Sequence, residues 1–330
     1  MFYTSLPELR KLERQNLNHR RKAFRGLVSL FRGKGRNQNS KASETSSTAT
    51  RGLAMHESAE EETLILDKHF EFDDRRVAWG CMGEGPPIVL VHGFPWSSQA
   101  WRRIAPWLSR TYTVYYFDML GCGESEKRKT SSVQPDIQNK LLAALIDHWQ
   151  LNCPHVVGHD FGGLASLRAH LIDGCDYSQL TLVDSVAMLP SGSPFFAHAQ
   201  KHAEAMRGLP EFVHEAVFHA FINYGSLRGL PTSVCNLYFD PWSGQEGKNA
   251  FYDQIEQSTV AELEEIQDLL QPLPFPVDII WGEHDRNIPM AKGKELAEKL
   301  KARSFTPVPN AAHAVHEDAP EAILSVLSSG

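Results

Sequence analysis

An apolar run that ends in Gly-x-Asp-x-Gly, at residues 155–163, constrains the fold of this chain more than any other stretch. Gly158 and Gly162 lie two residues before and after Asp160, a spacing that lets the backbone turn sharply from a strand into a helix. Such a turn would expose the Asp160 carboxylate at the helix N-terminus, where the helix dipole and free N–H groups favour an ionised acid. Taken alone, the pattern also fits an ordinary turn in which Asp160 caps a helix.

The chain from residue 64 onward alternates between strand and helix patterns. Repeated units of this kind predict an α/β fold, a mostly parallel sheet flanked by helices on both faces. Ligands bind such sheets at the carboxyl ends of the strands. The expected strands are 64–70, 75–81, 88–91, 113–117, 155–157, 180–183, 277–281 and 304–308. The expected helices around them are 99–109, 135–149, 162–171, 290–301 and 320–327.

A long interval, 187–273, separates the strand at 180–183 from the last two strands. It is rich in aromatic residues, and helical patterns occur at 195–206, 212–222 and 260–270. We expect a helical cap inserted before the last two strands, which would exclude water and shape an apolar pocket. Most of its aromatic side chains would fill the cap's own core. The predicted α/β core is therefore 61–186 and 274–330, with the cap at 187–273.

Residues 1–60 differ from the rest in charge. The first 40 hold ten Lys and Arg against two Glu, a net of +8, so with a total of −7 the remainder carries −15. Three interpretations of this basic N-terminal extension stay open: a disordered solvated tail, a mitochondrial presequence, or a basic helix on an anionic membrane surface. Met55 is also an alternative start, because the folded pattern begins just after it.

Composition excludes some functions and favours one compartment. A net charge of −7 argues against general nucleic-acid binding, and no apolar run is long enough for stable membrane insertion. Five widely spaced cysteines indicate free thiols in a reducing compartment. We expect an intracellular, cytoplasmic protein, with a mitochondrial location as the alternative and the oligomeric state open. The histidines lack metal-ligand spacing, so neither a metal nor an organic cofactor is expected.

Reactive side chains follow four of the predicted strands. His92-Gly93-Phe94-Pro95-Trp96 follows 88–91, and Asp160 follows 155–157. Gly282-Glu283-His284-Asp285 follows 277–281, and a segment with His313 follows 304–308. Because parallel strands end at one edge of the sheet, these groups are expected to meet there. The order of nucleophile, acid and His along the chain is that of a catalytic triad on an α/β sheet.

With these motifs, the chain from about residue 64 to its end resembles the α/β-hydrolase fold superfamily. The motifs are similar to those of its Asp-nucleophile branch, which includes epoxide hydrolases, haloalkane dehalogenases and haloacetate dehalogenases. The resemblance rests on His-Gly-Phe-Pro at 92–95, Gly-x-Gly-x-Ser at 121–125, Gly-His-Asp-x-Gly-Gly at 158–163, Trp-Gly-x-x-Asp at 281–285 and His-x-x-His-Glu-x-x-Pro-Glu at 313–321.

The resemblance implies a role for each matched residue. Asp160 would displace a halide or open an epoxide at an sp³ carbon and become an ester. His313 would activate the water that cleaves this ester, and Asp285 would orient His313 and stabilise its positive form. Backbone N–H groups of Phe94 and Phe161 would form the oxyanion hole.

Two rival assignments stay open. Asp184, at the end of the strand 180–183, is the alternative triad acid, because some relatives take the acid from that position. His316 is the alternative base. We prefer Asp285 and His313 because they match the motifs of the resembling family. Ser125 is interpreted as a turn residue, since it lacks the glycine that follows a nucleophile.

Epoxide hydrolysis is the first predicted reaction, and dehalogenation is the second. Relatives that cleave haloalkanes have Trp and Asn where this chain has Phe161 and Phe94, and haloacetate enzymes have Arg in place of Phe161. The expected partners are a small apolar organic substrate and water, and a non-catalytic ligand receptor on the same fold is the alternative of a different class. Candidate cap acids or substrate-binding residues are Tyr224, Tyr238, Tyr252 and Trp96.

Overall fold

The computed structural model describes residues 63–128 and 132–328, so the basic segment 1–60 lies outside the described residues. The described residues belong to one compact unit, built on an eight-stranded sheet in the order β1-β2-β4-β3-β5-β6-β7-β8. β1 and β2 run antiparallel to each other, β2 runs antiparallel to β4, and every later pair is parallel. The strands are β1 (Lys68–Phe72), β2 (Arg75–Met82), β3 (Pro87–Val91), β4 (Thr113–Phe117), β5 (His155–His159), β6 (Gln179–Val183), β7 (Val277–Gly282) and β8 (Ser304–Val308). The predicted α/β class and mostly parallel sheet are confirmed.

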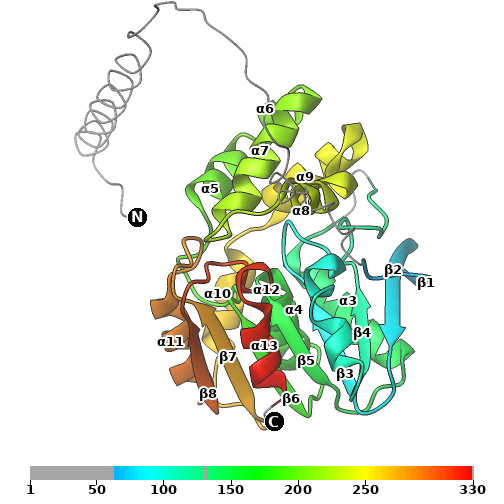
Figure 1. Ribbon diagram of the computed structural model, residues 1–330, viewed down its shortest axis with the longest axis vertical. Coiled ribbons are helices and arrows are strands. Elements are labelled where there is room, and N and C mark those ends of the chain that lie inside the picture. Colours follow the sequence, from blue (N-terminus) through cyan, green and yellow to red (C-terminus); the bar gives the residue numbers. More distant parts are fainter. Residues whose placement is uncertain (1–62, 129–131, 329–330) are drawn as a thin grey trace, which may run out of the picture. The chain divides into compact units, whose positions relative to one another are not determined.

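Both faces of the sheet are buried, which explains the wholly apolar central strands. Side chains alternate across a strand, so Val89 packs with one apolar cluster and Leu90 with the other. The first cluster includes buried residues of α3 (Pro135–His148), α4 (Phe161–Leu171) and α11 (Met290–Leu300). The second includes those of η1 (Ser98–Trp101), α2 (Ala105–Leu108), α12 (Val315–Asp318) and α13 (Pro320–Leu327). Figure 1 shows the sheet between these helices.

A run of helices lies between β6 and β7, as the sequence predicts. They are α5 (Pro194–Lys201), α6 (Ala203–Arg207), α7 (Glu211–Tyr224), α8 (Thr232–Phe239), η2 (Asp240–Trp242), α9 (Gly244–Gln257) and α10 (Ala261–Leu269). We call this insertion the cap, and Figure 1 shows α5 to α9 gathered at one end of the sheet.

Hydrogen bonds join the cap to loops that follow three strands. The Trp242 indole N–H donates to the Pro95 carbonyl at 2.9 Å, after β3. The Gln254 amide donates to the Leu120 carbonyl at 2.8 Å, after β4. After β8, the Ala314 N–H donates to the Gly225 carbonyl at 2.8 Å. The cap is therefore attached at the carboxyl edge, where α/β sheets bind ligands.

Some element boundaries differ from the prediction. The expected helix 99–109 is instead η1 followed by α2, and Pro106 lies in the first turn of α2. A proline is tolerated only in the first turn, so a helix begun at residue 99 cannot run through it. The pattern at 195–206 forms α5 and α6, which are separated at His202, where φ is −126° and ψ is 30°. Within the described residues, no helix has the length and apolar character that a bilayer-crossing segment needs.

Candidate active site

Asp160 occupies a strained turn between β5 and α4. Its φ is 52°, in the left-handed region that residues with a Cβ rarely adopt. The flanking residues are glycines because neighbouring backbone atoms leave no room for a side chain. A Cβ on Gly162 would lie 2.3 Å from the Val91 carbonyl oxygen. A Cβ on Gly158 would lie 2.7 Å from the Gly162 carbonyl oxygen. The sharp turn inferred from the Gly-x-Asp-x-Gly spacing is therefore present.

The loop after β8 brings His313 between two carboxylates. Its Nε2 lies 3.2 Å from Asp160 Oδ1, and its Nδ1 lies 2.9 Å from Asp285 Oδ2. Asp285 follows β7, and its other oxygen accepts the N–H groups of Asn287 at 2.7 Å and Ile288 at 2.9 Å. Asp160 and His313 are both buried. Residues from the ends of three strands thus form a connected Asp–His–Asp row.

The charges of this row determine the protonation of His313. Burial by itself would lower the pKa of His313, but the Asp285 charge and hydrogen bonds to Asp160 and Asp285 raise it well above the usual range. The raised pKa favours the protonated ring of His313 in the free site. Any event that neutralises Asp160 would remove part of this stabilisation and favour the neutral ring.

The backbone N–H of Phe94 donates to Asp160 Oδ2 at 2.9 Å, from the loop after β3. This bond places the Phe94 N–H beside the Asp160 carboxylate, and its role as an oxyanion-hole donor stays a prediction. For Phe161, only its position agrees with such a role. It is the first residue of α4 and lines the adjacent cavity.

Hydrogen-bond partners distinguish the rival assignments. His313 Nδ1 bonds to Asp285, whereas Asp184 lies buried behind the pair and accepts the Gly282 N–H at 2.8 Å. Neither ring nitrogen of His316 has a hydrogen-bond partner among the described residues, and burial lowers its pKa well below the usual range. Ser125 donates to the Asp118 carbonyl oxygen at 2.6 Å and accepts the Ala78 N–H, as expected of a turn residue.

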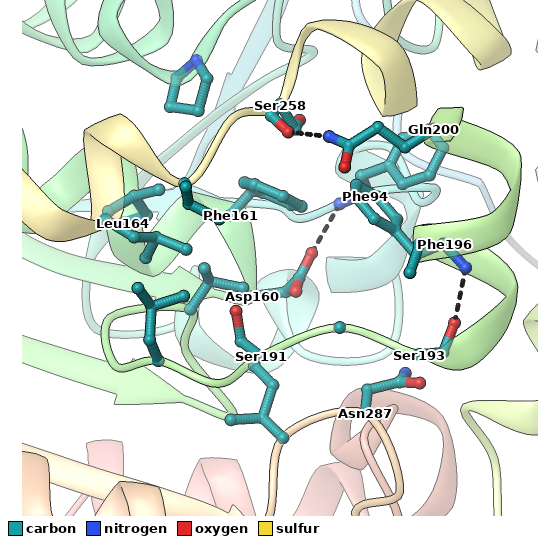
Figure 2. A pocket seen from close by; sticks show the side chains of 18 of the residues that line it. Phe94, Asp160, Phe161, Leu164, Ser191, Ser193, Phe196, Gln200, Ser258 and Asn287 are labelled. Atoms are coloured by element: carbon teal, nitrogen blue, oxygen red, sulfur yellow. Dashed lines mark hydrogen bonds between the residues drawn. The ribbon is translucent and has the colours of Figure 1, made fainter. Parts of the chain in front are cut away.

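A cavity of about 240 Å³ opens onto Asp160 and His313. Among its described lining residues these two are the only ionisable side chains. Figure 2 shows Phe94 and Phe161 on one side of Asp160 and Ser191 and Asn287 on the other. Apolar cap and core residues, including Leu164 and Phe196, make up much of the remaining wall.

The structure does not bring the predicted tyrosines into this cavity. Tyr238 is buried elsewhere, with its hydroxyl between Arg102 and Glu317. The Tyr252 hydroxyl lies 3.3 Å from His214 Nδ1 in the cap core, and Tyr224 lies at the surface under the Arg286 guanidinium. None of these three candidates is among the residues that line the cavity described here, so a role for them as cap acids stays a prediction without support from this lining. The hydroxyls of the buried Tyr238 and Tyr252 contact polar groups elsewhere, because a buried hydroxyl needs a partner.

Trp96 also lies outside the cavity lining. It is buried behind the base, with its ring centroid 5.6 Å from that of His313. The sequence did not predict the uncharged polar side chains of this lining, which are those of Ser191, Ser193, Gln200, Ser258, Thr259 and Asn287. The sequence feature that could have indicated Ser191 and Ser193 is the Ser-Gly-Ser-Pro segment at 191–194. It follows a predicted parallel strand at the edge of the sheet where ligands bind.

Side chains of the types that bind metal ions come close together at one place in the described part of the chain. One group of His and Asp side chains offers ligand atoms close together: Asp184, Asp285 and His313. His313 Nδ1 is already hydrogen-bonded to Asp285 Oδ2, so the arrangement fits an acid–base row.

Comparisons with known proteins agree with this architecture. Residues 88–326 match the model of the alpha/beta hydrolase family, so the chain belongs to that family. A crystal structure of an alpha/beta hydrolase fold protein from Burkholderia ambifaria is similar with 44% identity and a TM-score of 0.80, over 82% of this chain and 100% of that one.

Two shorter similarities concern named hydrolases. The chain is 35% identical over 88 residues to the soluble epoxide hydrolase of Corynebacterium sp., covering 27% of this chain and 30% of that protein. It is 33% identical over 130 residues to the fluoroacetate dehalogenase of Burkholderia sp., covering 36% of this chain and 42% of that protein. The resemblance drawn from the sequence motifs is confirmed at the level of the family.

Proposed function

We propose that this chain is a hydrolase in which Asp160 attacks a small uncharged electrophile and His313 directs water at the resulting ester. An epoxide is the first candidate substrate, and an alkyl halide is the second. The observation that carries the proposal is the position of Asp160, which contacts both the His313 ring and the Phe94 N–H at the floor of a largely apolar cavity.

In the first step, an oxygen of Asp160 bonds to an sp³ carbon, and the C–O bond of the epoxide or the C–X bond of the halide breaks. Esterification neutralises Asp160, so His313 loses one of the two charges that raise its pKa. The proton that His313 then sheds balances the reaction: it protonates the opened epoxide oxygen, or leaves with the halide.

In the second step, the neutral His313 takes a proton from water, and the hydroxide adds to the carboxyl carbon of the ester. The Phe94 N–H is in position to stabilise the oxyanion that forms. Collapse of the adduct breaks the ester bond, and the departing alkoxide takes the proton of the new Asp160 acid. The site returns to its starting charges, with Asp285 holding the positive ring.

The lining supports an uncharged substrate. Among the described lining residues there is no Lys or Arg to pair with a substrate carboxylate, which disfavours haloacids. At roughly 30 Å³ per water-sized group, a cavity of about 240 Å³ accepts on the order of eight such groups. Ser191 and Asn287 flank Asp160 and supply the neutral donors that an opened epoxide oxygen needs. Such donors would also serve a departing halide, so the epoxide ranks first because Phe94 and Phe161 stand where haloalkane-cleaving relatives have Asn and Trp.

The test uses His313→Gln, in which solvent water supplies the proton that an opened epoxide oxygen takes up, so the ester should form, more slowly than in the unsubstituted chain, without being hydrolysed. The variant is incubated with a pool of small epoxides and alkyl halides, and the Asp160 peptide is analysed by mass spectrometry. Addition of a whole epoxide supports epoxide opening, whereas addition of a substrate minus its halide supports dehalogenation. His316→Gln is the matched control and should accumulate no ester. Ligand binding without an adduct in any variant would instead favour a receptor.

A further inference from the structure

We propose that Asp184 and Asp285 form a proton-sharing carboxyl pair behind His313, in which Asp184 is a positioning residue that can replace Asp285 as the counter-charge. The inference rests on the function proposed above and extends it to a residue that the two steps do not use.

The pair is assembled by neighbouring strands. Asp184 directly follows β6, Asp285 lies three residues after β7, and the two strands are paired in parallel register. One ligand atom from each of Asp184, Asp285 and His313 lies within 4.8 Å of the other two. Asp184 is thus close enough to act on both members of the existing ion pair.

The partners of Asp184 do not satisfy an ionised carboxylate. Its side chain is fully buried, Oδ1 accepts the Gly282 N–H, and Oδ2 has no hydrogen-bond partner among the described residues. An ionised oxygen in such a place is costly, and two adjacent carboxylates seldom both ionise. A proton on Asp184 removes the unpartnered buried charge and the repulsion between the two carboxylates, because its hydroxyl can then donate to Asp285.

The electrostatics agree with this arrangement. Burial and then the charge of Asp285 raise the pKa of Asp184 well above its usual range, although the His313 charge and the Gly282 N–H act in the opposite direction. The titratable groups that face Asp184 are Asp285 and His313, and His313 in turn contacts Asp160 and His159. The hydrogen that Asp184 donates would hold the Asp285 carboxylate in line with His313.

The backbone favours an acid or amide at this place. Asp184 has a φ of 42°, in the left-handed region that Asp and Asn tolerate better than other residues with a Cβ. Asp184→Asn is therefore the matched variant: it keeps the shape, the backbone preference and a donor toward Asp285, but cannot become an anion.

The test compares Asp184→Asn, Asp285→Asn and the double variant by the rate of ester hydrolysis in single turnovers. Asp184→Asn is the single-variant reference from which the additional loss in the double variant is measured. A triad whose acid is replaced by Asn loses roughly 10⁴-fold. If Asp184 takes over, Asp285→Asn should lose only about 100-fold, and the double variant should lose at least tenfold more. Asp147→Asn, on the surface, is the control.

The pH profile separates this role from a purely structural one. In Asp285→Asn, hydrolysis should rise with pH through an additional ionisation, that of Asp184, which the double variant lacks. A double variant identical to Asp285→Asn at every pH would overturn the proposal.

A second measurement needs no substrate. NMR titration of His313 should give a raised pKa in Asp285→Asn and a lower one in the double variant. Equal values in the two would also overturn the proposal. If His313→Gln forms no ester but this titration behaves as expected, the proposed reaction fails while the carboxyl pair stands.

Discussion

His159 Nε2 lies 3.0 Å from the carbonyl oxygen of His313, so the residue before the nucleophile holds the backbone of the base. Burial lowers the pKa of His159 to about 4, and a neutral ring can donate this one hydrogen bond. This bond to the main chain of His313 joins the two loops in addition to the contact between the Asp160 and His313 side chains. Movement of the base away from the nucleophile would break this bond.

His159→Leu should therefore slow ester hydrolysis more than ester formation. Loss of the hydrogen bond lowers the free energy of unfolding by about 1 kcal/mol and frees the His313 loop, and we expect hydrolysis to fall roughly tenfold. Rapid-quench analysis of the two steps measures this. His155→Leu, on the same strand, is the matched control, because His155 contacts Thr181 away from the site. Equal slowing of both steps would show that the contact does not act through the base.

Asp160→Asn should lower the pKa of His313. The amide has the shape of the carboxylate but no charge, so it imitates the neutralised, esterified state. Since the Asp160 contact helps to raise the pKa of His313, its loss should reduce that pKa. NMR titration of the labelled ring gives the value, with Asp147→Asn as control. An unchanged pKa would mean that neutralising Asp160 does not favour the neutral His313 ring, contrary to the proposed mechanism.

How far the sequence predicts this structure depends on what each residue contacts. Hydrophobic periodicity and turn residues predict the strands. Because parallel strands share one carboxyl edge, the sequence also predicts that Asp160, Asp285 and His313 meet. The direction of the cap tyrosines does not, because it depends on tertiary partners. The Tyr238 hydroxyl is held by Glu317 and Arg102, which are far away in sequence. The lining residues in loops, such as Ser191 and Asn287, have no periodicity that a pattern could detect.

Tyr238→Phe and Tyr252→Phe should both leave ester formation within about threefold of the unsubstituted rate. Neither hydroxyl lines the cavity, so neither can protonate a leaving oxygen there. Tyr238→Phe should still lower the free energy of unfolding by about 1–3 kcal/mol, because it removes a buried hydrogen bond to a charged group. Denaturant unfolding and single-turnover kinetics check the two effects. A large loss of ester formation in either variant would mean that the substituted tyrosine takes part in this step.

Acid pH should destabilise the fold through His155 and His159. Burial lowers the pKa of each to about 4, below the usual 6.5, so between these values the unfolded chain binds more protons. Their contribution is complete above about pH 6.5 and is lost as the pH falls toward 4, by up to about 3 kcal/mol for each ring. Denaturant unfolding from pH 7 to pH 4 measures the slope. His155→Gln should reduce the slope, and an unchanged slope would contradict the assignment.

Gly93→Ala should abolish ester formation without unfolding the chain. A Cβ at this position would lie 2.4 Å from Asp160 Cβ and 2.5 Å from its Oδ2, closer than such atoms approach. Asp160 must then move, and it loses its alignment with both the Phe94 N–H and His313. Overpacking of this kind destabilises by about 1–3 kcal/mol, which a chain of this size can tolerate.

We expect a loss of at least about 100-fold in ester formation, comparable to the removal of one oxyanion-hole donor. The measurement is adduct formation in the His313→Gln background, with circular dichroism as the check of folding. Gly208→Ala is the control, because the nearest atom to its added Cβ is 3.3 Å away, in the turn after α6. Gly93→Ala with normal ester formation would mean that Asp160 does not need the geometry described here to react.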